Sequence, residues 1–136
     1  MKKFICLLLV LVITFSFSAC GGYEPAEPTT SAPAVEMNLM TIGGHFQNNE
    51  IYARETHEGK RYKITAKVER VSEDYVIVTS LLHDGFSVYL YYNNSQIDFV
   101  RGISRGDIIT FEGTLKTIRS AVGMDFHNVI FIKEAE

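Results

Sequence analysis

The chain has 136 residues, of which 46% are hydrophobic and 21% are charged, and it contains no tryptophan. This length allows one ordinary domain at most. The formal charge is −3, from 13 basic and 16 acidic residues, so no basic excess points to a polyanionic partner. The hydrophobic content also excludes a largely disordered chain.

The first residues have the pattern of an export signal. A short basic end precedes an apolar run from Phe4 to Phe17, and the small residues Ser18 and Ala19 follow. The apolar run of about 14 residues is shorter than the roughly 20 that a membrane-spanning helix needs. We therefore expect residues 1–19 to be a cleaved signal peptide, with a retained transmembrane anchor as the alternative.

The end of this segment, Ser18-Ala19-Cys20-Gly21, resembles the lipobox of bacterial lipoproteins, in which the cysteine receives a lipid through a thioether before cleavage. Phe17 stands where that motif usually has leucine. The resemblance implies that Cys20 is the first mature residue. It also implies that a membrane anchor of diacylglycerol and palmitate on Cys20 holds the protein on the extracytoplasmic face. The other cysteine, Cys6, lies in the apolar run, so the mature domain has no thiol.

Residues 20–36 hold all three prolines and three glutamates, a composition that cannot bury enough apolar surface to fold. We expect a flexible tether here, followed by one domain over residues 37–136. From Cys20 onward the chain has 11 basic and 16 acidic residues, a formal charge of −5, whereas from Ile51 onward the charge is −1. The folded part is therefore close to neutral.

The expected domain begins with a short amphipathic helix from Met37 to Asn48, which we expect to cover one opening of the structure that follows. Gly43 and Gly44 disfavour a helix at its centre. Alternation of apolar and polar residues then predicts five strands. These cover 61–69, 75–79, 86–91, 109–118 and 124–132, with a short helix near 93–102 capped by Asn93.

Five strands with a helix between the third and fourth are typical of the OB-fold, a small all-β Greek-key barrel with minor helices. Gly113, inside the long fourth strand, suggests a bend or a close backbone approach of the kind that barrel corners need. A five-stranded meander sandwich and an SH3-like barrel are the structural alternatives.

Three segments also resemble the tRNA-anti-like family of OB-fold proteins, many of which are lipoproteins. The three segments are Asn49-Glu50 with Ala53, Glu58-Gly59-Lys60 with Ile64-Thr65-Ala66-Lys67-Val68, and the run from Arg105 to Gly113. The resemblance spans roughly Leu39 to Ile132 and implies the OB-fold. The shared residues have structural roles in that fold, so the resemblance implies no functional residues.

Two tyrosines are the candidate ligand-stacking residues. If Phe86, Val88 and Leu90 face inward, Tyr89 and Tyr91 lie on the outer face of the third strand, where OB-folds bind their ligands. Exposed aromatic rings stack on bases or sugars. The alternative is that one or both rings pack under a neighbouring loop or helix.

Three basic residues share the outer face of the first strand. Arg61, Lys63 and Lys67 could form an electrostatic rim for phosphates, or they could be an ordinary solvated strand face. The near-neutral charge favours the second interpretation, because phosphate binding needs a clustered basic excess.

Catalytic and metal-binding patterns are missing from the sequence. The four histidines show no paired spacing typical of metal sites, and the pair His83 and Asp84 comes closest to one. The mature domain has no cysteine nucleophile and no GxSxG motif. We therefore expect no enzymatic activity, no metal and no cofactor.

The sequence thus predicts a monomeric binding module that is lipid-anchored through Cys20. Its ligand is an oligosaccharide, a peptide or a nucleic acid, and the near-neutral charge of the domain disfavours the nucleic acid. The alternative is a structural lipoprotein that docks on another envelope protein through a strand edge or the N-terminal helix.

Overall fold

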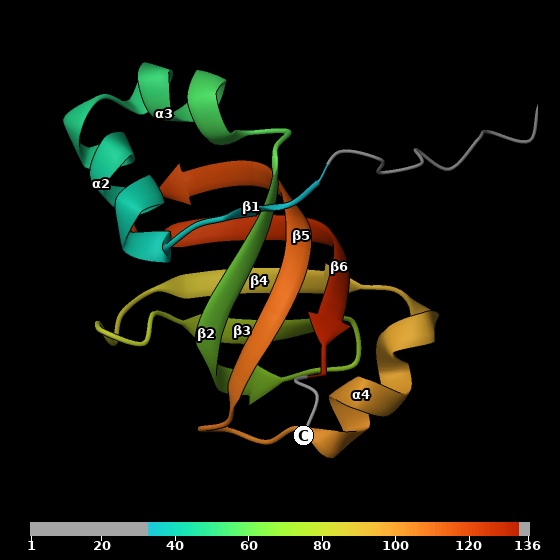
Figure 1. Ribbon diagram of the computed structural model, residues 1–136. Coiled ribbons are helices and arrows are strands. Elements are labelled where there is room, and N and C mark those ends of the chain that lie inside the picture. Colours follow the sequence, from blue (N-terminus) through green and yellow to red (C-terminus); the bar gives the residue numbers. More distant parts are fainter. Residues whose placement is uncertain (1–32, 134–136) are drawn as a thin grey trace, which may run out of the picture. The chain divides into compact units, whose positions relative to one another are not determined.

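The computed structural model describes residues 33–133 (Figure 1). The predicted signal peptide, Cys20 and residues 20–32 of the predicted tether lie outside the described residues. The elements, in chain order, are β1 (Val35–Glu36), α2 (Leu39–Asn48), α3 (Glu50–His57), β2 (Arg61–Val71), β3 (Tyr75–Thr79), β4 (Ser87–Tyr92), the 3-10 turn η1 (Asn94–Gln96), α4 (Ile97–Gly102), β5 (Ile108–Ser120) and β6 (Gly123–Ile132).

Strands β2 to β6 form a closed barrel. Their order around the barrel is β2-β3-β4-β6-β5, and β5 pairs back onto β2. The neighbours β4 and β6 run parallel, and the other barrel pairs run antiparallel. A meander cannot make that parallel pair, because strands joined by tight turns are antiparallel. With α4 between β4 and β5, this is the OB-fold, and the predicted fold is confirmed.

Alternate residues of the strands fill the barrel interior. Phe111 of β5 and Phe126 of β6 meet edge to face, with ring centroids 5.4 Å apart, and both side chains are fully buried. Each buried side chain of this size contributes about 1.5–3 kcal/mol. The other large side chains without exposed surface include Ile64, Val76, Val88, Leu90, Leu115, Ile118 and Met124.

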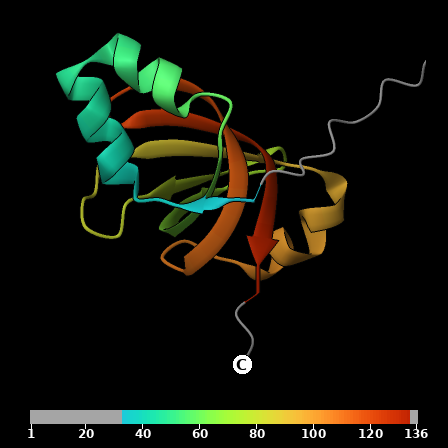
Figure 2. The same ribbon diagram turned by 45° about the horizontal axis from the view of Figure 1, so that its top comes forward.

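The expected N-terminal helix is a pair of helices, since Asn49 ends α2 and caps α3. The Asn38 side chain accepts a hydrogen bond from the Met40 amide at 2.8 Å, and the Asn49 side chain accepts one from the Tyr52 amide at 3.0 Å. The pair lies over one end of the barrel and α4 lies at the other (Figures 1 and 2). Leu39 and Ile42 extend the core into α2, as the predicted cover requires.

Gly43 explains why a glycine pair occurs in a helix. A Cβ on Gly43 would collide with the backbone carbonyl of Ala121, in the turn between β5 and β6, whereas a Cβ on Gly44 would meet open space. Helix α2 therefore packs close to that turn through Gly43. Gly113, where the sequence suggests a bend or a close backbone approach, is another tight position: an added Cβ would lie 3.1 Å from the side chain of Val129.

Asn128 makes a bulge in β6. Its φ of +53° lies in the left-handed region, and the pairing with β4 shifts register at the same point. His127 and Asn128 are both exposed as a result, while Val129 returns to the interior. This bulge is the physical reason why the alternation of the last strand is interrupted in the sequence.

Ordered contacts begin before the expected domain boundary at residue 37. Val35 and Glu36 form β1, which pairs in parallel with Tyr62 and Lys63 of β2. The Met37 amide donates to the Lys63 carbonyl at 3.1 Å. The last residues of the predicted tether thus belong to the sheet.

Candidate functional site

The alternation along β4 places two tyrosines on the outside of the barrel. Val88 and Leu90 have no exposed surface, and Tyr89 and Tyr91 between them are half-buried on the outer face. Their partial burial comes from aromatic neighbours on adjacent strands.

Four rings form what we call the aromatic face: Tyr75, Tyr89, Tyr91 and His127. Tyr75 of β3 lies 5.3 Å from Tyr89 and 6.0 Å from Tyr91, centroid to centroid. Tyr89 and Tyr91 are nearly parallel at 6.5 Å, and Tyr91 lies 4.7 Å from the His127 ring. The barrel thus supports an extended row of rings across β3, β4 and β6.

An arginine and a carboxylate flank this row. The Arg119 guanidinium lies 4.5 Å from the ring centroid of Tyr89, within range of a cation–π contact. It also lies 3.0 Å from Oδ1 of Asp125, the β6 residue that pairs with Tyr89 across the sheet. Hydrogen-bond donors and acceptors therefore stand next to the rings.

The rings also protect an outward-facing isoleucine. Ile77 pairs with Tyr89 across β3 and β4, and only 9% of its surface is exposed. The tyrosines thus cover apolar surface that the solvent would otherwise contact. Replacing one ring costs stability as well as any ligand contact, so variants at this face need a folding control.

The three predicted basic residues are not brought to the aromatic face, because β3 separates β2 from β4. Each is paired with a carboxylate instead. Nη2 of Arg61, whose side chain is 7% exposed, lies 3.2 Å from Glu112. Lys63 lies 3.4 Å from Glu36, and Lys67 lies 2.8 Å from Asp84. Lys67 holds the pKa of the Asp84 carboxyl below its usual value.

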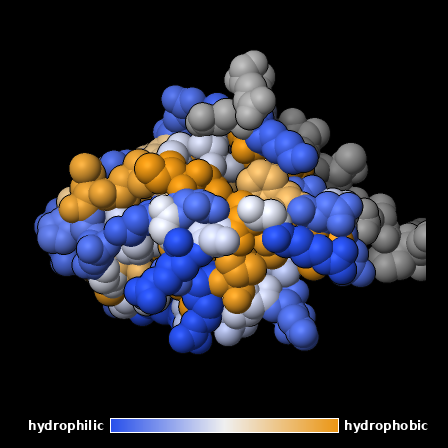
Figure 3. Space-filling view, turned by 90° about the horizontal axis from the view of Figure 1, so that it is seen from below, coloured by the Kyte–Doolittle hydropathy of each residue, from blue (hydrophilic) through white to orange (hydrophobic). Residues whose placement is uncertain are grey.

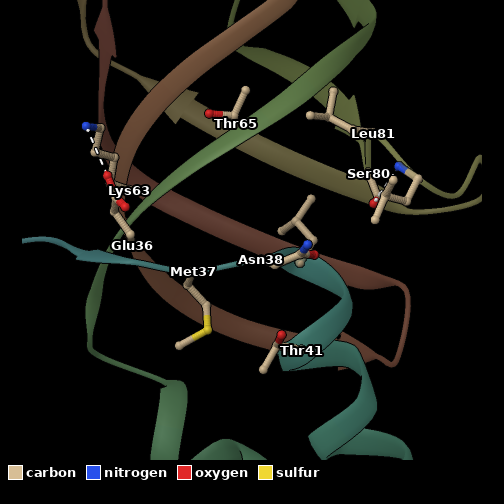
Figure 4. Close-up of a pocket in the computed structure, with 10 residues that line it drawn as sticks. Glu36, Met37, Asn38, Thr41, Lys63, Thr65, Ser80 and Leu81 are labelled. Atoms are coloured by element: carbon tan, nitrogen blue, oxygen red, sulfur yellow. Dashed lines mark hydrogen bonds and ion pairs between the residues drawn. The ribbon is translucent and has the colours of Figure 1, made fainter.

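Two grooves run along the outside of β2. One, of about 650 Å³, lies between β1, the start of α2, β2 and the loop after β3 (Figure 4). Its lining includes Lys63, Thr65, Ser80 and the exposed Leu81 and Leu82. The other, of about 380 Å³, includes Lys67 and Asp84. The Leu81-Leu82 loop thus borders the first of these grooves.

A buried chain of hydrogen bonds connects α2, α3 and β2. Nδ1 of His57 lies 2.7 Å from the Tyr62 hydroxyl, and Nε2 of His57 lies 2.8 Å from Nδ1 of His45. His57 and Tyr62 are each 2% exposed. Burial lowers the pKa of His57, and the nearby His45 and Lys60 act in the same direction. Burial also raises the pKa of Tyr62.

Sequence reasoning missed four residues of the site: Tyr75, Arg119, Asp125 and His127. Tyr75 carried a usable signal, since it stands two residues before the outward-facing Ile77 on the same strand. His127 and Asp125 reach the tyrosines through the parallel pairing of β4 with β6, which no local pattern reveals.

The described residues contain no group of three or more histidine, cysteine, aspartate and glutamate side chains placed to hold a metal ion. None of the helices in residues 33–133 is long and apolar enough to span a membrane.

The barrel is similar to solved structures of low sequence identity. A lipoprotein from Klebsiella pneumoniae, to which nucleic acid binding is provisionally attributed, aligns with a TM-score of 0.60 and 15% identity over 74% of this chain and 92% of that one. Replication protein A of U. maydis bound to single-stranded DNA aligns at 0.41, with 12% identity over 74% of each chain. An OBody, AM3L15, bound to hen egg-white lysozyme also aligns at 0.41, with 14% identity over 60% of this chain and 83% of that one. The first likeness shows the OB-fold.

No protein-family model matches the chain, and the search of curated proteins found no match.

Proposed function

We propose that this protein is a lipid-anchored, extracytoplasmic binding module that holds its ligand on the aromatic face. The observation that carries the proposal is the row of half-buried rings around Tyr89 and Tyr91, on the strand face that OB-folds use for ligands. The proposal assigns no catalytic step. The anchor is the lipid on Cys20, with residues 1–19 removed and the segment from Cys20 onward as the tether to the domain, whose sheet begins with β1 at Val35–Glu36.

Membership of the tRNA-anti-like family is part of the same proposal. It is supported by the OB-fold and by the likeness to a lipoprotein of that fold. Membership of this family does not identify the ligand, because OB-folds bind oligonucleotides and oligosaccharides on the same face.

Recognition at this face works by stacking. Flat or apolar parts of a ligand lie on Tyr89 and Tyr91, whose rings are nearly parallel. Each stacked group contributes about 1–3 kcal/mol in comparable sites. Arg61, Lys63 and Lys67 form a secondary rim on β2, and each would have to exchange its carboxylate partner for a ligand group.

The test is a titration of the full-length chain in detergent with oligosaccharides, oligonucleotides and peptides. Tyrosine fluorescence reports binding directly, because no tryptophan is present to mask it. Tyr89→Ala and Tyr91→Ala should each weaken binding about tenfold or more, while the Tyr→Phe variants retain most of it. Tyr52→Ala, at a tyrosine of α3 that is 52% exposed, is the matched control. Unchanged affinity in both alanine variants would remove the proposal.

A second candidate function, docking on another envelope protein, is favoured by the 650 Å³ groove. In the described part of the chain, β1 pairs with one edge of β2 as far as Lys63, and β3 pairs with the same edge from Lys67 onward. Between these two pairings, at Thr65, this edge of β2 has no strand beside it within residues 33–133. Thr65 lines the groove together with Leu81 and Leu82. Figure 3, which views the molecule from the end opposite α2 and α3, shows a band of hydrophobic side chains across that end. A photo-crosslinker at Leu82 should then give one discrete product in cells, and the same group at Ile51 on α3 should not.

A further inference from the structure

We propose that the ligand of the aromatic face is a neutral oligosaccharide chain. This inference rests on the proposed function and adds the ligand class. It is carried by the combination of stacked rings with a paired guanidinium and carboxylate, in a neighbourhood without basic excess.

The charges around the face are balanced. Arg119 is paired with Asp125 at 3.0 Å, so its positive charge is already compensated. Arg70 of β2 is exposed and pairs with Ile77 of β3. The turn that follows β2 carries the acidic residues Glu73 and Asp74, which offset the charge of Arg70. A chain of phosphates needs several uncompensated cations along its path, since each neutralised phosphate requires a lysine or arginine. The aromatic face does not present such a row.

The polar side chains beside the rings can form hydrogen bonds with the hydroxyl groups of a sugar. A guanidinium donates several hydrogen bonds from a fixed fork, so Arg119, whose side chain is 46% exposed, can bind the two hydroxyls of neighbouring sugar carbons. Asp125, whose Oδ1 is buried, holds the guanidinium in place beside Tyr89. Both groups lie against Tyr89, where the apolar face of a sugar ring would stack. His127, exposed at the far end beside Tyr91, adds one donor or acceptor. Stacking and hydroxyl recognition therefore occur over the same span.

The shape also suits a chain. The grooves of about 650, 380 and 330 Å³ are lined by residues of other parts of the barrel, whereas the aromatic face is a row of rings on the outer side of three strands. Small ligands are usually enclosed in pockets. An extended row of rings across three strands instead contacts successive units of a polymer, each on its own ring.

The experiment compares ligand classes on the full-length chain in detergent. The protein is applied to an array of neutral oligosaccharides and peptides, and separately titrated with oligo-dT and oligo-rU. We expect binding to at least one neutral oligosaccharide, weakened about tenfold or more by Tyr89→Ala or Tyr91→Ala. Raising NaCl from about 50 to about 200 mM should change this affinity less than about twofold, whereas binding through several phosphates would fall by orders of magnitude.

Arg119→Lys tests the role of the guanidinium at this face. Lysine keeps the positive charge but loses the planar fork. Oligosaccharide affinity should fall about fivefold or more in this variant, and an unchanged affinity would remove Arg119 from the binding site. Lys116→Arg, at an exposed residue of β5, is the control.

The outcomes separate this inference from the proposed function. Tyrosine-dependent binding of an oligonucleotide or a peptide, without binding of any neutral oligosaccharide, would overturn the ligand class and leave the binding module in place. No tyrosine-dependent binding in any class would overturn both.

Discussion

Nδ1 of His45 lies 2.8 Å from Nε2 of His57, and the two rings lie edge to edge, 17° from parallel, with centroids 5.0 Å apart. A contact of this kind requires one proton between the two nitrogens. If both rings are charged, two N–H groups face each other and the contact is lost. The pair therefore links the attachment of α2 and α3 to the protonation of a buried histidine.

The pH dependence of stability follows from the lowered pKa of His57. Above about pH 6.5 this ring is neutral in both the folded and the unfolded chain, so it adds no pH dependence. As pH falls below about 6.5, the unfolded chain takes up the proton first, and the folded state loses stability until its own lower pKa is passed. Urea unfolding should therefore show lower stability at about pH 5.5 than at about pH 8.

His57→Gln tests this assignment. The variant should be less stable than the wild type at pH 8, because it disturbs the bonds to His45 and Tyr62, but its stability should change less between pH 8 and pH 5.5. His127→Gln removes an exposed histidine of β6 and should keep the wild-type dependence. An equal pH dependence in His57→Gln and the wild type would contradict the role of this histidine.

The two neighbouring glycines of α2 should respond in opposite directions. Gly43→Ala forces a methyl group against the Ala121 carbonyl, so α2 must shift, at a cost of about 1–3 kcal/mol. Gly44→Ala meets open space in a helix and should stabilise by about 0.5–1 kcal/mol. Thermal unfolding of both variants measures the difference, and a similar change in both would contradict the close approach.

The ion pairs of β2 should differ in importance because they differ in burial. Removing Arg61, which is 7% exposed, leaves Glu112 without its partner, and Arg61→Ala should destabilise by about 1–3 kcal/mol. Lys63→Met breaks a more exposed pair with Glu36 and should change stability by less than about 1 kcal/mol. Chemical denaturation gives both values. A larger loss in Lys63→Met would show that burial does not decide the contribution of these pairs.

Substitutions of the two cysteines test the lipid anchor. Cys20→Ser should abolish labelling by a fatty-acid probe in cells, because the acceptor thiol is lost. Cys6→Ser, which changes a residue inside the predicted signal, should still be labelled. Labelling of Cys20→Ser at the wild-type level would contradict the lipobox assignment.

Local patterns predicted most of the barrel. Period-two alternation identifies the barrel strands because each has one face in the core and one in solvent. β1 could not be found in this way, since Val35 and Glu36 become a strand only by pairing with the free edge of β2. The bulge at Asn128 also depends on the pairing with β4.

The candidate site was also predictable only in part, because it depends on pairing between strands that are distant in sequence. Alternation along one strand places Tyr89 and Tyr91 outward. That they meet His127 and Asp125 depends on the parallel register of β4 and β6, and that Lys67 meets Asp84 depends on the path of a loop. Contacts between residues distant in sequence decide which side chains are free to bind.

The most direct test of the central claim is hydroxyl-radical footprinting of the full-length chain, read by mass spectrometry, with and without a saturating ligand from the array or the titrations. The account predicts that ligand lowers the oxidation of Tyr89 and Tyr91 severalfold and leaves Tyr52 on α3 unchanged. Unchanged oxidation of Tyr89 and Tyr91, with protection elsewhere on the barrel, would contradict it.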